Sequence, residues 1–94
     1  MDDKIEKVRV DKWLWWTRFY KTRSLSVKMI SSGVVRLNSR HVRKPSAEIT
    51  IDDILTLRHG KVVRVIKVLS LEEGRQSYDK AKKMYEDIDQ IKLH

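Results

Sequence analysis

Side chains that bind phosphate are concentrated in one stretch of the sequence, from Arg9 to Ser46. This stretch holds ten of the 21 Lys and Arg residues and a single acid, Asp11, so its net charge is +9 where the whole chain carries +8. Guanidinium and ammonium groups neutralise phosphates and release counterions, and arginine can also bind a phosphate through two parallel hydrogen bonds. The pattern favours a polyanion as the partner, and the alternative is an ordinary solvated surface.

The candidate binding residues lie on the expected helices and on the hairpin that follows them. The cations are Arg18, Lys21, Arg23 and Lys28 in the helical part, and Arg36, Arg40, Arg43 and Lys44 on or after the hairpin. Four neutral side chains could add hydrogen bonds to phosphate or 2′-hydroxyl groups, although each is also a common cap or turn residue: Thr22, Ser24, Asn38 and Ser46. If about six contacts form, the slope of log affinity against log salt should be about −4 to −5.

Catalytic chemistry has little support. The acids fall in expected turns or on a solvated helix face, namely Asp52, Asp53, Glu72, Glu73, Glu86, Asp87 and Asp89. The histidines, His41, His59 and His94, are scattered, the three glycines form no phosphate-binding loop, and there is no cysteine. We therefore expect no enzymatic activity, no metal, no cofactor and no small-molecule substrate.

A first, aromatic helix is expected over residues 12–20, with Asp11 as its N-cap. Its apolar residues cover most of the helix circumference, so it must be covered on more than one side. We therefore expect at least two of Trp13, Trp15 and Trp16 to be core. Whether the remaining one is core or a contact with RNA is left open.

A second helix is expected to follow directly. Thr22 or Ser24 can cap it, and it runs through Ser32. Gly33 then suits the left-handed residue that ends a helix.

Beyond Gly33 the apolar period changes from helical to alternating. A tight turn at Asn38 and Ser39 predicts a hairpin, although Asn-Ser is a weaker turn pair than Asn-Gly. Two further strands are predicted at residues 54–57 and 62–69, which gives a small antiparallel sheet. From Ser77 a helical stripe returns through Ile91 and predicts a closing amphipathic helix.

These elements predict an α+β domain with two N-terminal helices packed on a small, mainly antiparallel sheet, plus a C-terminal helix. We expect residues 1–8 to be flexible, residues 9–70 to form the binding domain, and residues 75–94 to pack on it. Ninety-four residues suit one domain, and no apolar run approaches the roughly twenty residues of a membrane helix. A cytoplasmic monomer without a secretion signal is the expectation.

The ordered motifs resemble a known RNA-binding domain. The residues that carry the resemblance are Arg9 to Leu14, Arg18 to Leu25, Ile30 to Asn38, and Lys44 to Ser46. They are similar to the domain named after ribosomal small-subunit protein four and, more narrowly, to the ribosome-associated heat shock protein 15 family. The resemblance covers about residues 8–69, and Ala81 with Tyr85 resembles the helix that follows in these proteins.

The resemblance implies a helix pair packed on a small sheet, with RNA bound across the helices and the hairpin. It implies a role on free large ribosomal subunits that still carry a nascent chain on tRNA, in translation rescue or quality control. The family's basic positions match Arg9, Lys12, Arg18, Lys21, Arg23, Lys28, Arg36, Arg43 and Lys44, with Ser24 and Asn38 at its polar positions. Two positions depart from the family: Ser39 and Asp52 each stand where glycine is common. The sequence also lacks the long basic tail of the longer members.

The leading hypothesis is a non-enzymatic protein that binds ribosomal RNA of the large subunit, and tRNA with it, in a role linked to heat shock. One alternative is a regulator that reads duplex DNA through a helix-turn-helix. Against it, residues 24–32 of the second helix lack the Asn, Gln and Arg side chains that read base edges and have only Lys28. The other alternative is a general module for structured RNA or tRNA.

Overall fold

The computed structural model describes residues 6–93, in which two helices are followed by strands, a short helical segment and a last strand. The helices are α1 (Val10–Trp16), α2 (Arg23–Ser31), α3 (Tyr78–Ala81) and the 3-10 turn η1 (Lys82–Met84). The strands are β1 (Val8–Arg9), β2 (Val35–Leu37), β3 (Arg40–Val42), β4 (Glu48–Ile49), β5 (Ile54–His59), β6 (Val62–Val68) and β7 (Tyr85–Lys92).

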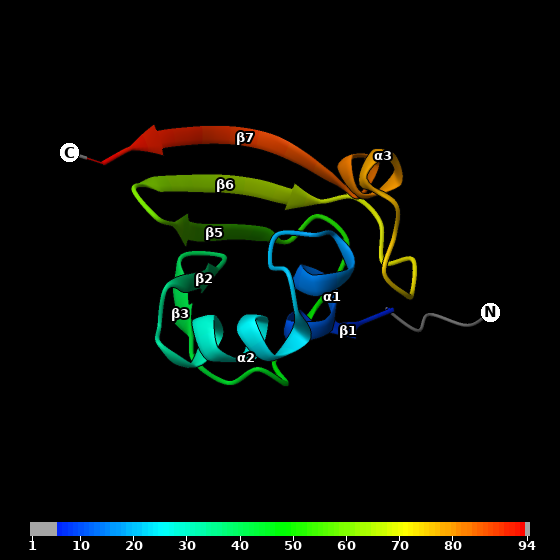
Figure 1. The fold of residues 1–94 in the computed structure, drawn as a ribbon, viewed down its shortest axis with the longest axis horizontal. Coiled ribbons are helices and arrows are strands. Elements are labelled where there is room, and N and C mark those ends of the chain that lie inside the picture. Colours follow the sequence, from blue (N-terminus) through cyan, green and yellow to red (C-terminus); the bar gives the residue numbers. More distant parts are fainter. Residues whose placement is uncertain (1–5, 94) are drawn as a thin grey trace.

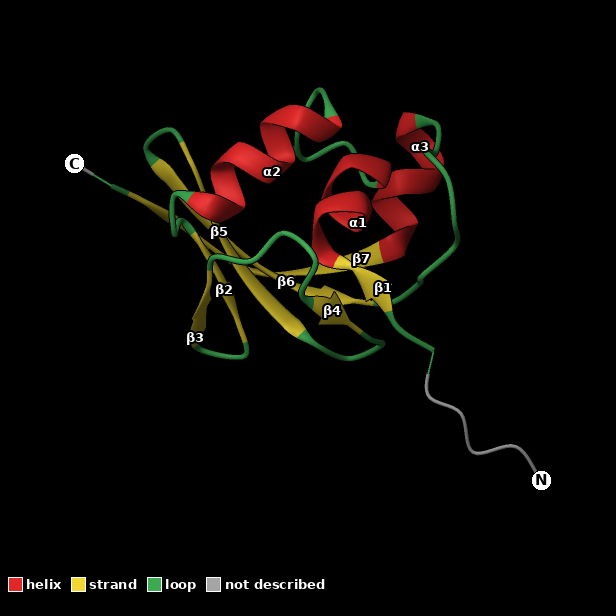
Figure 2. Cartoon of the chain, turned by 90° about the horizontal axis from the view of Figure 1, so that it is seen from below, coloured by secondary structure: helices red, strands yellow, loops and turns green. Residues whose placement is uncertain are grey.

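In this part of the chain the strands form one antiparallel sheet of order β3-β2-β5-β6-β7, and β1 pairs separately with β4. The helices lie on one face of the large sheet (Figures 1 and 2). Alternation along the strands explains this, because Val35, Leu55 and Leu57 are buried while the residues between them are more exposed. The predicted α+β fold class is therefore confirmed.

The aromatic helix supplies much of the core, as its composition predicts. Trp13 and Leu14 are fully buried and Trp16 nearly so, and the Trp13 indole Nε1 donates a 2.8 Å hydrogen bond to the Ser70 carbonyl. Trp15 is half-buried, and the Arg75 guanidinium lies 5.6 Å from its ring centroid. Two tryptophans are thus core, and the third is partly covered by the C-terminal segment.

The first helix differs from the expectation in both of its ends. It begins at Val10, because the 43–47 segment satisfies its first N–H groups: Val10 donates to Ala47 O at 2.8 Å and Asp11 to Pro45 O at 3.3 Å. The N-cap is Arg9, with no side-chain cap bond, so the prediction that Asp11 caps the helix is wrong. The helix ends at Trp16, and Arg18 (φ 63°) turns the chain away.

The second helix and the hairpin agree with the sequence. The Thr22 hydroxyl caps α2 by accepting from the Leu25 N–H at 3.0 Å, and Gly33 after it has φ +86°. Asn38 (φ 50°) and Ser39 (φ 75°) form the turn between β2 and β3. Asp52 has φ 73°, so both positions at which the family commonly has glycine hold the left-handed conformation here.

The C-terminal segment is largely a strand, and the predicted helix through Ile91 is wrong beyond Met84. Residues Tyr85–Lys92 pair with β6 over its whole length, with a bulge between Val65 and Ile66. Without this partner, β6 would expose a seven-residue unpaired edge, and pairing satisfies its backbone groups. The apolar stripe predicted that Ile88 and Ile91 pack against the domain, but they are 49% and 48% exposed.

The predicted flexible segment 1–8 falls mostly outside the described residues, as does His94, and Val8 pairs with Ile49. The proposed domain limits at residues 9–70 remain a prediction. Within residues 6–93, no helix has the length and apolar character that crossing a membrane requires.

Candidate nucleic-acid interface

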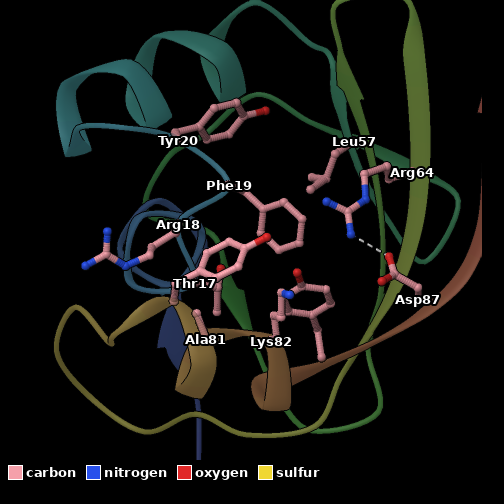
Figure 3. Close-up of a pocket in the computed structure, with 11 residues that line it drawn as sticks. Thr17, Arg18, Phe19, Tyr20, Leu57, Arg64, Ala81, Lys82 and Asp87 are labelled. Atoms are coloured by element: carbon pink, nitrogen blue, oxygen red, sulfur yellow. Dashed lines mark hydrogen bonds and ion pairs between the residues drawn. The ribbon is translucent and has the colours of Figure 1, made fainter.

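The structure divides the basic stretch into three groups, and the first lies in the loop between α1 and α2. Arg18 is exposed there, and its Nε donates a 2.6 Å hydrogen bond to the Gln76 carbonyl. Arg75 donates in turn to the carbonyl of Lys21 at 2.7 Å. This loop is therefore tied to the chain before α3, and the Arg18 guanidinium extends away from the pocket that the loop helps to line (Figure 3).

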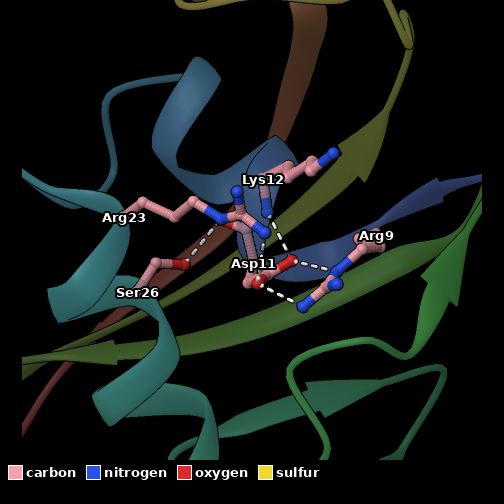
Figure 4. Close-up of polar contacts among 5 residues, drawn as sticks. All are labelled: Arg9, Asp11, Lys12, Arg23 and Ser26. Carbon is pink, nitrogen blue, oxygen red and sulfur yellow. Dashed lines mark hydrogen bonds and ion pairs between the residues drawn. The ribbon is translucent and has the colours of Figure 1, made fainter.

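The second group is held by Asp11, whose carboxylate is fully buried (Figure 4). It accepts two hydrogen bonds from the Arg9 guanidinium, at 3.0 and 2.9 Å, and one from the Lys12 N–H at 2.8 Å. The Arg23 guanidinium lies 3.5 Å from the same carboxylate. The carbonyl of Asp11 accepts from the Ser26 hydroxyl at 2.9 Å, which joins α1 to α2.

This arrangement orients two cations without neutralising the surface. The side chains of Arg9 and Arg23 remain 42% and 43% exposed, so both guanidinium groups can still reach a phosphate. Two positive charges thus surround one negative charge, because Lys12 contacts Asp11 only through its backbone N–H. Arginine donates in a fixed fork, so N–H groups that Asp11 leaves free are pre-oriented for an anion.

The third group follows α2 and the hairpin. The segment from β3 to β4 runs past α2 to the start of α1, as Figure 1 shows. The Arg43 guanidinium lies against Gly33 at the end of α2, since a Cβ on Gly33 would be 2.8 Å from its central carbon. Lys28 and Lys44 are exposed on these two elements, and Arg40 is exposed at the start of β3.

One predicted residue points to the other face of the sheet. Arg36 is exposed between buried Val35 and half-buried Leu37, so alternation directs it away from the helices. It lines a pocket of about 430 Å³ together with Arg58 and His41, whose Nδ1 lies 3.1 Å from the Gly33 carbonyl oxygen. The candidate residues therefore do not share a single face.

The neutral candidates mostly have structural hydrogen bonds. Thr22 caps α2, and Asn38 fixes its turn by donating to the Asp53 carboxylate at 3.1 Å and accepting from the Ile54 N–H at 2.8 Å. Ser24 is exposed on the first turn of α2, and Ser46 is half-buried in the 43–47 segment. Ser24 is thus the best placed of them to reach a ligand.

Arg58, Arg64 and Arg75 are cations near the candidate surfaces that the sequence reasoning did not select. All three lie outside the basic stretch, where charges of both signs alternate, so composition gives no signal for them. Burial acts to lower the pKa of Arg64, but the hydrogen bond and charge of Asp87, with a smaller contribution from Tyr85, raise it above its usual range. Arg64 therefore stays charged.

No group of three or more His, Asp or Glu side chains converges in residues 6–93. The geometry instead presents exposed cations on α2, on the segment after β3 and around Asp11.

Comparison with known proteins defines the class. A model of the S4 domain family matches residues 8–55, just over half of the chain, which includes the Asp11 group, α2 and the hairpin. The chain is thus an S4-domain protein, the class of RNA-binding domain that its motifs resemble.

The relatives are more specific. The chain is 42% identical over 81 residues to heat shock protein 15 of Escherichia coli (strain K12). The aligned residues make up 86% of this chain and 60% of that protein. It matches the trimeric structure of Vibrio cholerae heat shock protein 15 with a TM-score of 0.82 and 39% identity, covering 87% of this chain and 82% of that one. The chain belongs to the heat shock protein 15 family.

A more distant relative has a descriptive name. The RQC P-site tRNA stabilizing factor of Streptococcus pneumoniae (strain ATCC BAA-255 / R6) is 27% identical over 86 residues, covering 92% of this chain and 96% of that protein. The chain spans about three fifths of the length of the Escherichia coli relative.

Proposed function

We propose that this chain is a non-enzymatic, cytoplasmic protein that binds ribosomal RNA on free large ribosomal subunits and contacts the tRNA held there. The observation that carries the proposal is the ion-pair group of Asp11, Arg9 and Arg23. Asp11 holds the two arginines next to the exposed cations of α2 and the 43–47 segment. Guanidinium groups that are held in place and still exposed suit the phosphate backbone of folded RNA.

The relatives support the ribosomal part of the proposal. One is named for stabilising tRNA in the P site, and others are named as heat shock proteins. We infer that this chain acts in rescue or quality control of stalled translation, under conditions that include heat stress. Because the Vibrio cholerae relative is a trimer, the monomer expected from this sequence is to be checked by light scattering of the purified chain.

The first prediction tests the basic surface with exposed residues that lie outside the core. The side chains of Lys28, Arg40 and Lys44 are exposed, and within residues 6–93 they form no hydrogen bond or ion pair. Reversing all three to Glu should abolish co-sedimentation with large ribosomal subunits in a sucrose gradient. The fold should survive, because none of the three contributes to the core.

A matched control carries the same change of charge elsewhere. Lys61, Lys80 and Lys83 are also exposed but lie outside the basic stretch, and reversing these three to Glu should leave sedimentation largely intact. If both triple variants lose binding equally, only net charge matters and the proposed surface is wrong. Competition with duplex DNA at the same salt concentration should displace the parent chain poorly.

A further inference from the structure

The chain has an aromatic pocket whose outer wall lies beyond the part that the S4 model matches. The pocket has a volume of about 460 Å³ and lies between the α1–α2 loop, β6 and the C-terminal segment (Figure 3). The single phenylalanine of the chain, Phe19, lines it together with all three tyrosines, Tyr20, Tyr78 and Tyr85. A volume of this size suits a small ligand or one nucleotide.

A guanidinium group forms one side of this pocket. The Arg64 guanidinium carbon lies 5.0 Å from the centroid of the Phe19 ring and 5.6 Å from that of Tyr85. Its terminal nitrogen donates a 2.6 Å hydrogen bond to Asp87, whereas its buried Nε has no hydrogen-bond partner within residues 6–93. Opposite, the Lys82 ammonium lies 4.4 Å from the centroid of the Tyr78 ring.

We propose that this pocket takes one unstacked nucleobase of the bound RNA, with the base against Tyr78 and its edge toward the Arg64–Asp87 pair. This deepens the RNA-binding role proposed above and depends on it. Single-stranded bases stack on aromatic rings and on guanidinium planes, and both surfaces are present here. The pocket also adjoins the basic stretch, because the α1–α2 loop that contains Arg18 forms one of its walls.

The charges at the Arg64–Asp87 pair favour a base over a phosphate on that side of the pocket. Asp87 is 57% exposed and would repel a phosphate placed beside Arg64. A base edge carries both donors and acceptors, which match a carboxylate next to a guanidinium. The phosphate of the same nucleotide would lie toward Lys82 and the α1–α2 loop, where the charges are positive.

The Tyr78 ring allows a clean test, because it is 63% exposed and its removal leaves the core intact. Two RNA hairpins with the same stem would be compared by fluorescence anisotropy, one fully paired and one with a single unpaired purine in the stem. The parent chain should bind the bulged hairpin more tightly. Tyr78→Ala should reduce this preference about tenfold, the order expected for one base stacked on an aromatic ring, whereas Tyr78→Phe should retain it.

A second readout separates stacking from charge. Tyr78→Ala should leave the slope of log affinity against log salt unchanged, because no phosphate contact is lost, while the single substitution Lys28→Ala should reduce it. A titration with adenosine and guanosine monophosphate identifies the source of the base. If the parent chain binds a free nucleotide and Tyr78→Ala does not, the pocket also accepts free nucleotides. If neither binds one but the bulge preference depends on Tyr78, the base must be part of RNA.

The outcomes distinguish the two proposals. If the parent chain binds neither hairpin, the proposed function itself fails. If it binds both equally and the triple variant abolishes binding, the proposed function stands and the pocket inference is overturned. The inference is also overturned if Tyr78→Ala leaves the bulge preference unchanged. A lower molar mass of that variant in light scattering would then indicate that a second copy of the chain occupies the pocket.

Discussion

At the scale of single residues, Asp11 shows how one acid can serve a basic surface. Sequence reasoning made it a helix cap, but it lies one residue inside the helix and is fully buried. A buried carboxylate needs partners, and here they are Arg9, Arg23 and the Lys12 N–H. The only acid of the stretch therefore organises its cations, and replacing it would release both arginines.

Gly33 gives a prediction at the same scale. Its φ of +86° is costly for any residue with a Cβ, so Gly33→Ala should lower the free energy of unfolding by about 1 kcal/mol. The new methyl group would also displace the Arg43 guanidinium, which is flexible enough to move. We expect weaker RNA binding, with a salt slope reduced by up to about 0.9 if one phosphate contact is lost.

Gly60→Ala is the matched control for this substitution. Gly60 also has a positive φ, +63°, but apart from Gly60 and its two chain neighbours, no atom of the described residues lies within 4 Å of the position of its Cβ. The loss of stability in urea denaturation should be similar, and RNA affinity should not change. Equal losses of RNA affinity in both variants would show that the contact between Gly33 and Arg43 has no role in binding.

At the scale of elements, the short hairpin keeps its shape with a strained turn. Ser39 has φ 75°, in the region that glycine occupies at little cost, and the pairing of β2 with β3 depends on this turn. The Asn38 side chain compensates by bonding to Asp53 and to the Ile54 N–H, which ties the turn to the start of β5. The weaker Asn-Ser pair is thus stabilised by the neighbouring strand.

Ser39→Gly should therefore stabilise the chain. Relief of the left-handed strain, about 1–2 kcal/mol, exceeds the added entropy of glycine in the unfolded chain, about 0.5–1 kcal/mol, so a net gain of about 0.5 kcal/mol is expected. Ser32→Gly should have the opposite sign, because Ser32 has φ −76° and its hydroxyl donates to the Met29 carbonyl. Urea denaturation of the two variants measures both effects, and a loss of stability in Ser39→Gly would contradict the strain argument.

At the scale of the whole molecule, the helices and the C-terminal segment enclose one core on one face of the sheet. Tyr20 lies at this junction, 2% exposed, and burial raises the pKa of its hydroxyl from 10.0 to about 12. The other face of the sheet carries Arg36 and Arg58 and has no covering helix in the described structure (Figure 2). Positive charge thus lies on both sides of the sheet.

The raised pKa predicts how stability depends on pH at the alkaline end. The folded state holds the Tyr20 proton more tightly than the unfolded state, so this contribution is fully present below pH 10. It is lost as the pH rises from 10 toward 12, because the unfolded chain then loses its proton first. The stability difference between the parent chain and Tyr20→Phe should shrink over this range in urea denaturation. A constant difference would contradict the assignment.

The sequence by itself determined the fold class, the two helices, the hairpin and the family. These features depend on local rules, such as the Thr22 cap, the positive φ at Gly33 and the Asn38 turn, which act over a few residues. The concentration of charge in Arg9 to Ser46 likewise needed only counting. The roles of individual cations in RNA binding remain predictions.

The tertiary structure alone decided which of those cations meet and that residues Tyr85–Lys92 form a strand. Asp11 contacts Arg23 only because α2 packs on α1, and Arg36 is separated from them by the alternation of a strand. The segment after Ser77 has a helical pattern. From Tyr85 on it forms a strand instead, because it pairs with the backbone of β6, which would otherwise be an unpaired edge. The aromatic pocket exists only because this strand and the α1–α2 loop meet, residues that lie far apart in the sequence.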